Sequence, residues 1–119
     1  MLRNWDIIRK ILLKVEQLPT EDSTFASNEL EGVDSEAVAY HMRLLLEAHL
    51  MVGGCRDALG PPFYHASRLT WAGHEFLDKI KNESLWQQIK TQSRTKGVDL
   101  SFTVITDLAK GLITSLISP

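Results

Sequence analysis

The sequence predicts an α+β fold in which helices pack on a small antiparallel sheet, with two further helices after them. Two observations indicate this class. Apolar residues recur at the three- and four-residue steps of a helix in segments 5–18, 35–48 and 71–81. Between the last two segments, residues 50–69 hold two runs of strand-forming residues separated by turn residues, which is typical of a β-hairpin.

Length and composition are those of one globular domain. The chain has 119 residues, 44% of them apolar and 24% charged, which is enough for one core and too little for two. We expect residues 1–82 to form the main domain and residues 83–119 a helical extension of the same compact unit. No apolar run approaches the roughly 20 residues of a membrane span. The first residues lack the apolar core of a signal peptide, and Cys55 is alone, so we expect a cytoplasmic protein.

Charge is distributed unevenly along the chain. Between Glu16 and Glu36 there are seven acids and no Lys or Arg, whereas between Lys79 and Lys96 there are five bases and one acid. Three interpretations of the basic stretch stay open: the solvated face of two helices, a contact with a DNA backbone, or attraction to the acidic segment of a second copy.

The first helix is expected to begin after Asn4, whose side chain can cap it, and to end before Pro19. The residue before a proline avoids helical geometry, which sets that end. Residues 20–33 contain few apolar positions, so the short helix that a helix-turn-helix motif needs is not expected there. We expect a loop and a short extended segment around Phe25 that pairs with the hairpin.

The central helix follows, with Asp34 or Ser35 as its cap. His41 is expected to be packed and hydrogen-bonded beside the apolar stripe of this helix. His49 stands at the helix end, where a left-handed residue is expected and histidine adopts that conformation at some cost. The stripe that faces the core consists of Val38, Met42, Leu45 and Leu46.

The hairpin is expected to use residues 50–56 and 63–69 as strands, with a turn at 57–62. Gly53 and Gly54 interrupt the first strand, which suggests a bulge or a close approach of two backbones. Thr70 then caps a helix whose expected inward residues are Trp71, Phe76, Leu77 and Ile80.

Two more helices are expected towards the C-terminus. A capping box at Ser84 and Gln87 begins the first, and Gly97 closes it. Ser101 caps the second. All three tryptophans, at positions 5, 71 and 86, are expected to anchor the core. The apolar face of the last helix is the expected surface of a homodimer, made by Ile105, Leu108, Leu112, Ile113 and Leu116.

Two of these segments resemble winged-helix regulators, in the same order. Residues 38–50 (V-A-Y-H-M-R-L-L-L-E-A-H-L) resemble the recognition-helix pattern V-x-x-H-L-x-x-L-x-x-A-G-L, with His49 in place of the glycine. Residues 68–77 (R-L-T-W-A-G-H-E-F-L) resemble the L-T-x-x-G segment that follows the wing. The resemblance implies a winged helix-turn-helix-like domain with a small β-hairpin wing and two extra C-terminal helices.

Most of the chain also resembles the bacterial and prophage family called domain of unknown function 2513. The matching segments are R-N-W-D-I-I-R-K-I-L-L, V-A-Y-H-M-R-L-L-L-E-A-H-L, R-L-T-W-A-G-H-E-F-L-D and L-S-F-T-V-I-T-D-L-A. This resemblance implies no catalytic residues and no particular function.

The winged-helix resemblance implies DNA binding that regulates transcription by occupying a site. The central helix would enter the major groove, and the hairpin would approach the neighbouring backbone or minor groove. Asp34, Glu36 and Glu47 oppose this, because phosphate contacts need Lys and Arg. The alternatives are a solvated surface and an interaction module that binds a basic protein surface through the acidic face. The predicted DNA contacts are Ser35, Ala39, Tyr40, Arg43, Arg56, His65 and Arg68.

Motifs for catalysis, cofactors and metals are not expected in this chain. His74 and Glu75 begin like the H-E-x-x-H zinc helix, but Asp78 stands where the second histidine is needed. There is no phosphate-binding glycine loop and no G-x-S-x-G nucleophile motif. We therefore expect a protein that is not an enzyme and needs no cofactor.

Overall fold

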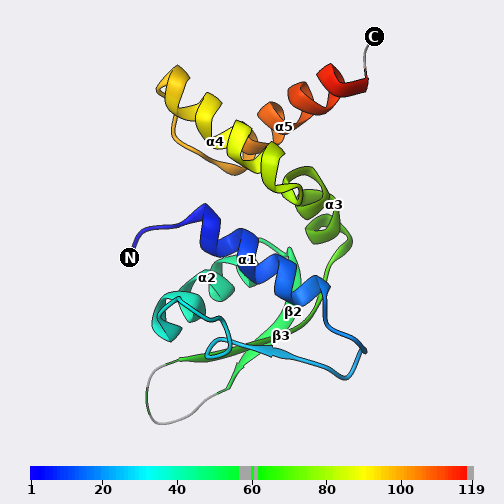
Figure 1. Ribbon diagram of the computed structural model, residues 1–119. Coiled ribbons are helices and arrows are strands. Elements are labelled where there is room, and N and C mark those ends of the chain that lie inside the picture. The colour runs from blue at the N-terminus through cyan, green and yellow to red at the C-terminus, as the bar shows by residue number, and fades with distance from the viewer. Residues whose placement is uncertain (57–59, 61, 118–119) are drawn as a thin grey trace. The chain divides into compact units, whose positions relative to one another are not determined.

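The computed structural model has the α+β architecture that the sequence predicts (Figure 1). It describes residues 1–56, 60 and 62–117, and these form five helices and a three-stranded antiparallel sheet. In chain order the elements are α1 (Trp5–Glu16), β1 (Phe25–Ala26), α2 (Ser35–Glu47), β2 (Met51–Arg56), β3 (Phe63–Leu69), α3 (Trp71–Ile80), α4 (Glu83–Lys96) and α5 (Phe102–Ile117).

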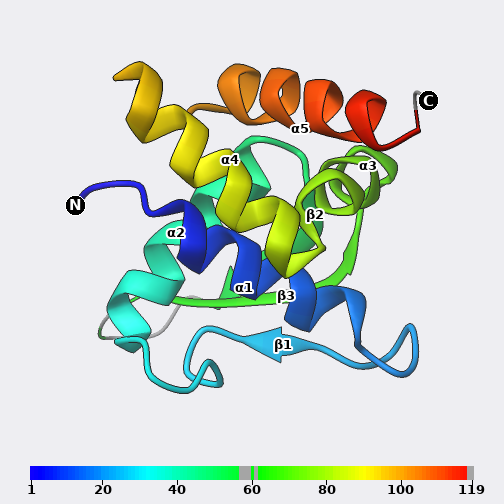
Figure 2. The ribbon, with the colours of Figure 1, turned by 45° about the horizontal axis from the view of Figure 1, so that its top comes forward.

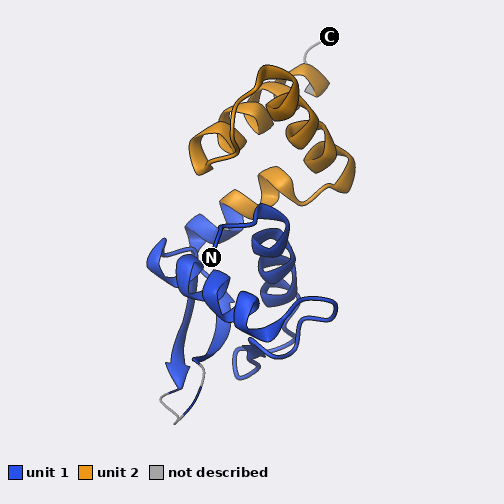
Figure 3. Ribbon diagram, turned by 90° about the vertical axis from the view of Figure 1, so that its left-hand side faces the viewer, with its two compact units in different colours: residues 1–75 blue, residues 76–119 orange. Residues whose placement is uncertain are grey.

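The chain forms two compact units, residues 1–75 and residues 76–119 (Figure 3). The boundary between them falls inside α3. The first unit contains the sheet with α1 and α2, and the second contains α4 and α5. The expected division at residues 82 and 83 stays a prediction.

The sheet has the order β1-β3-β2, with both pairs antiparallel. Phe25 lies opposite Ala66 and Ala26 opposite His65, so the short extended segment pairs with the hairpin as expected. Figure 2 shows β1 beside β3. Most of the expected turn at 57–62 lies outside the described residues.

The core of the first unit comes from α1, α2 and the strands. Helices α1 and α2 contact each other, and both contact β3. The stripe predicted for α2 is buried, except that Leu46 is only half-buried. The fully buried apolar residues of the two helices include Ile8, Ile11, Leu12, Val15, Val38, Met42 and Leu45.

His41 ties the start of α1 to α2. Its side chain is 1% exposed, and its Nε2 accepts a hydrogen bond of 2.8 Å from the backbone N–H of Asn4. Because Nε2 is the acceptor, the ring proton is on Nδ1, which donates to the carbonyl of Ala37 at 2.7 Å. Asn4 in turn caps α1 through its side chain, as expected. The expectation of a packed, hydrogen-bonded histidine is confirmed.

Turns, and no helix, connect β1 to α2. The Glu29 carboxylate accepts from the Ala26 backbone N–H at 2.8 Å, and the Asp34 carboxylate caps α2 by accepting from the Ala37 N–H at 3.4 Å. Of the two expected caps, Asp34 is the one used. Two acids of the acidic segment therefore bind the chain's own backbone.

The end of α2 and the start of α3 meet at Leu50. His49 has a φ of 59°, the left-handed conformation expected at this position. The Leu50 carbonyl accepts from the Thr70 N–H at 3.0 Å, and the Thr70 hydroxyl donates to the His49 carbonyl at 2.7 Å. Thr70 also caps α3, because its Oγ1 accepts from the Gly73 N–H at 3.0 Å.

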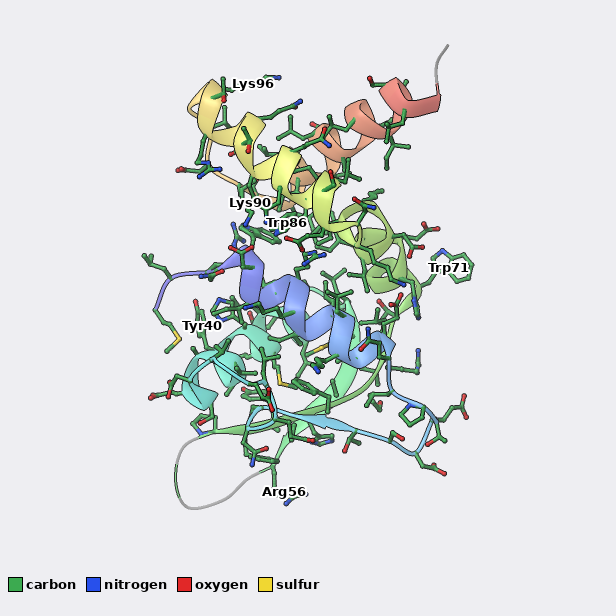
Figure 4. The ribbon with its side chains drawn as sticks, viewed as in Figure 1. Tyr40, Arg56, Trp71, Trp86, Lys90 and Lys96 are labelled. Carbon is green, nitrogen blue, oxygen red and sulfur yellow. The ribbon has the colours of Figure 1, made fainter. Side chains whose placement is uncertain are left out.

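Helix α3 corrects one expectation of the sequence. Its buried positions are Gly73, Phe76, Leu77 and Ile80, whereas Trp71 is 82% exposed and projects away from the ribbon (Figure 4). Trp71 does not anchor the core. A residue two positions before Gly73 lies almost opposite the buried stripe in a helix of 3.6 residues per turn, whatever its side chain is.

The second unit also differs in detail from the sequence prediction. Asn82 caps α4 by accepting from the Leu85 N–H at 2.9 Å, so the expected capping box at Ser84 is wrong. Gly97, with a φ of 68°, closes α4, and Ser101 caps α5 through the Val104 N–H, both as expected. Trp86 is 1% exposed and is the one tryptophan of the expected three that is fully buried.

Helix α5 packs along α4 within this unit. Phe102 stacks on Phe76 with ring centroids 4.7 Å apart. Ile105 is 0% exposed, so it belongs to the core. The expectation that it lies on a dimer surface is wrong. The reason is that Ile105 and Ala109 lie one turn apart on the same side of the first half of α5, and both are covered.

Gly73 is required by the close approach at Leu50. An ideal Cβ on Gly73 would lie 1.9 Å from the Leu50 carbonyl oxygen, whereas a Cβ on Gly111 in α5 would meet nothing within 4 Å. We expect Gly73→Ala to lower the free energy of unfolding by about 1–3 kcal/mol, as overpacking does. The control Gly111→Ala should raise it by about 0.5–1 kcal/mol, because alanine favours a helix interior. Denaturant unfolding measures both, and equal effects of the two would contradict the required approach.

Candidate nucleic-acid interface

A β-bulge sets which side chains of the hairpin share a face. Val52 lies opposite Arg68 and Gly53 opposite Ala66, so Ser67 is an extra residue on β3. Its hydroxyl donates to the Val52 carbonyl at 3.3 Å. The bulge that Gly53 and Gly54 suggest is therefore present.

Gly53 permits this bulge. An ideal Cβ on Gly53 would lie 2.0 Å from the carbonyl oxygen of His65, which no side chain can tolerate. Both features suggested by the sequence, a bulge and a close backbone approach, thus occur at one glycine. Gly54 is different, since a Cβ there would only touch the imidazole of His65 at 3.4 Å.

The extra residue brings the basic side chains of the hairpin to one face. Side chains of a strand alternate between faces, so residues 65 and 68 would point to opposite sides without the bulge. With it, Arg68 is paired with Val52, His65 with Gly54, and position 56 with position 63, all on the same face. The opposite face carries the buried residues Met51, Ala66 and Leu69.

We call the face that carries Arg56, His65 and Arg68 the outer face, and the ionisable side chains of the strands on it are all basic. Arg56 and Arg68 are exposed, and His65 is half-buried. The Arg56 guanidinium carbon lies 5.4 Å from the centroid of the Phe63 ring, and Figure 4 shows the Arg56 side chain pointing away from the sheet. The three strands contain no Asp or Glu. Three of the seven predicted DNA contacts therefore lie together on one face of strands that contain no acid.

The predicted contacts on α2 lie in a different environment. Ala39 is 3% exposed, so the expectation that it faces a ligand is wrong: its methyl group packs in the core. Arg43 is exposed, but its Nε lies 3.1 Å from Oε1 of Glu47, one helical turn later. Tyr40 is half-buried and packs edge-on against His41, with ring centroids 5.4 Å apart.

Acids dominate the N-terminal end of α2. A hollow of about 330 Å³ lies there, between the helix start and the end of the hairpin. Its polar walls include the carboxylates Asp34 and Glu36 beside Ser35, and Phe63 lines the other side. The N–H groups of a helix start attract anions, but here the Asp34 carboxylate already occupies that place. We conclude that this hollow disfavours a phosphate.

Tyr64 lies on the face of the hairpin opposite to the outer face, paired with Cys55. Burial raises the pKa of the Tyr64 phenol above its usual value of 10.0, and interactions with Cys55 and with the negative charge of Glu47 raise it further. Arg43 lowers the pKa of the same phenol. The two members of the charged pair on α2 thus act on this phenol in opposite directions.

Other functional classes find little support in the described part of the chain. Among those residues, no three His, Cys, Asp or Glu side chains gather where they could hold a metal ion. None of the helices there is long and apolar enough to cross a bilayer. His74, Glu75 and Asp78 are simply exposed residues of α3.

Two features of the candidate site were not predicted from the sequence. Phe63 supports Arg56, and Ser67 makes the bulge that aligns Arg68 with His65. The paired glycines indicated a bulge but not the strand that contains the extra residue. The sequence did offer a signal for the contact between Arg56 and Phe63, because the two residues lie at opposite ends of the predicted turn and so face each other across the hairpin.

Comparison with known proteins gives two matches in sequence and none in structure. A family model described as "Hypothetical protein (DUF2513)" matches residues 2–99. A protein of Haemophilus influenzae described as "Uncharacterized protein" is 39% identical over 118 residues, which cover 99% of this chain and 100% of that protein. No solved structure matches the chain.

The environment of Tyr64 is open to a spectroscopic test. In Tyr40→Phe, which leaves Tyr64 as the only tyrosine, we expect the phenolate absorbance to appear at a higher pH than in a free phenol, because burial favours the neutral form. Cys55→Ser should move that pKa back towards 10.0. Since the folded pKa is the higher one, the folded state binds more protons above pH 10.0, and the stability should fall as the pH rises through that range. A phenol that titrates at its ordinary pKa would contradict the half-buried placement of Tyr64 beside Cys55.

Proposed function

This chain belongs to the DUF2513 family, and we propose that it is a winged-helix-like, non-enzymatic protein that binds duplex DNA through the outer face of its β2–β3 hairpin. It would act as a regulator of the bacterial or prophage type, by occupying a site on DNA. The order α1, β1, α2, β2, β3 supports the winged-helix assignment. The turns at residues 27–34 are the departure from that fold, because a further helix is usual there.

The outer face of the hairpin carries this proposal. Arg56 and Arg68 are exposed, His65 lies between them on the same face, and no carboxylate is present in the strands. Phosphate contacts by Lys and Arg supply most of the sequence-independent affinity for DNA, and a nearby acid weakens them. Of the elements named in the sequence analysis as DNA contacts, helix α2 carries acids, whereas the described strands β2 and β3 carry basic residues and no acid.

Helix α2 contributes differently from what the sequence predicts. The exposed pair of Arg43 and Glu47 is neutral overall, so it adds little attraction for phosphate. Ser35 and Tyr40 keep hydroxyl groups that could bond to a backbone oxygen, but acids surround Ser35. In this proposal α2 holds the hairpin in place, and the hairpin binds the DNA.

A second function, binding to a basic protein surface, is favoured by one observation. Six acids between positions 21 and 36 are exposed, and no Lys or Arg lies between residues 17 and 36. Such a field attracts a positively charged partner and speeds the encounter with it. Absence of DNA binding at low salt would favour this second function.

A homodimer through α5 also remains a proposal. Leu116 is 81% exposed, and Leu108, Leu112 and Ile113 are half-buried, so these four could meet a second copy, without Ile105. We expect Leu112→Glu to give a folded monomer, because a charge on this face opposes its burial. Light scattering measures the mass and circular dichroism the folding. A wild-type protein that is monomeric at high concentration would contradict the dimer.

The proposed function is tested by binding to random duplex DNA at low and at physiological salt. We expect Arg56→Ala and Arg68→Ala each to weaken binding and to lower the slope of log K against log salt by about one unit, the effect of one lost phosphate contact. Lys14→Ala is a matched control, because it removes one exposed positive charge from α1. Lys14→Ala should leave DNA binding unchanged. Arg43→Ala should also leave it unchanged, because Glu47 already balances the charge of Arg43.

Hairpin variants that bind as tightly as the wild type would overturn the proposed site. A wild-type protein that no duplex retains at low salt would overturn the function itself.

A further inference from the structure

Helix α4 differs from the other helices in its charge. Each of the other four helices carries an acid beyond its first turn: Glu16 in α1, Glu47 in α2, Asp78 in α3 and Asp107 in α5. In α4 the only acid is the first residue, Glu83. The rest of the helix contains three cations, at positions 90, 94 and 96.

The exposed side of α4 is rich in amide and hydroxyl groups. The buried side consists of Leu85, Trp86, Ile89 and Ser93. Away from it, the exposed residues recur at the three- and four-residue steps that define one face. We call these the amide face: Ser84, Gln87, Gln88, Thr91 and Thr95. A shallow hollow of about 440 Å³ runs along the first four of them and Gln92.

The hydrogen bonds within the amide face leave acceptor and donor capacity for a ligand. The Gln87 Nε2 donates to the Glu83 carboxylate at 2.8 Å. This hydrogen bond orients the Gln87 amide and leaves its carbonyl oxygen able to accept one. The Gln88 Nε2 reaches the Ser84 hydroxyl only at 3.4 Å, close to the limit of a hydrogen bond. Both side chains are exposed, so packing of the core does not require glutamine at either position.

We infer that the amide face of α4 reads base edges in the major groove of duplex DNA. A glutamine amide pairs with adenine through one donor and one acceptor, and Ser or Thr hydroxyls pair with bases or phosphates. A major groove about 12 Å wide admits a helix, and the 14 residues of α4 span roughly 21 Å. Arg94 lies three residues after Thr91 and is exposed in the last turn, at the flank of the amide face, where it would meet a phosphate.

This inference rests on the proposed binding of duplex DNA but uses another surface. The hairpin supplies phosphate contacts that are independent of sequence, and α4 supplies the choice of sequence. Lys90 is not needed for it, because its ammonium lies over the buried Trp86 ring, 5.6 Å from the centroid (Figure 4). A protein partner for the amide face is the competing occupant, and the test below separates the two.

The test starts from selection of a preferred site out of random duplex DNA with the wild-type protein. We expect the double variant Gln87→Ala, Gln88→Ala to bind the selected site about 10- to 100-fold more weakly and random duplex equally well, because bidentate base contacts are lost and phosphate contacts remain. Alanine favours helix, so α4 should stay folded. Gln17→Ala, at an exposed glutamine just after α1, is the matched control.

A second pair of variants tests the phosphate contacts. Arg94→Ala should weaken binding to selected and random duplex alike and lower the salt slope by about one unit. Lys110→Ala on α5 removes the same charge from the same unit and should have no effect.

The outcomes separate this inference from the proposed function. If the glutamine variant keeps both the affinity and the site preference, or if the wild type selects no site, base reading by α4 is overturned, whereas weaker binding by the hairpin variants would still support the hairpin. If only the α4 variants lose affinity, the inference stands and the hairpin site falls. A wild-type protein that binds no duplex at low salt overturns both.

Discussion

The backbone approach at Leu50 is the constraint on which the first unit depends. The Leu50 carbonyl accepts from Thr70, and it lies so close to α3 that Gly73 has no room for a side chain. The same point joins the end of α2, the start of β2 and the end of β3, where Met51 lies opposite Leu69. The left-handed His49 turns the chain from helix to strand within one residue. A larger residue at position 73 would push α3 away from this junction, so the glycine sets how closely helix and strand meet.

A second constraint acts on the hairpin and decides what its surface can do. The extra residue Ser67 shifts the alternation of β3, so that Ala66 and Leu69 both point into the core while His65 and Arg68 both point outwards. The bulge needs the close approach at Gly53, just as the helix junction needs Gly73. The two glycines that the fold requires therefore have separate consequences, one for the position of α3 and one for the charge of a surface.

The distribution of charge over the elements explains why the hairpin and α4 are favoured as binding surfaces over α2. Helix α2 begins with the acid that caps it, and its arginine is paired with Glu47. Acids at a helix start stabilise the helix through its dipole, but they repel phosphate at the same place. The strands contain no acid, and α4 has none after Glu83. Stability of α2 and attraction for DNA thus make opposite demands on the same positions.

Local sequence patterns correctly predict the helices, the hairpin, the pairing of Phe25 with the hairpin, and most of the caps, including Asn4, Thr70 and Ser101. These depend on neighbours within a few residues, which a local pattern records. The packing of the elements decided that Trp71 is exposed, that Ala39 and Ile105 are buried, and that Arg43 is paired. It also decided that Ser67 is the extra residue of the bulge, which brings Arg68 onto the face of His65. The physical reason is that burial and register depend on contacts between residues distant in the chain, and a side chain's type does not specify those contacts.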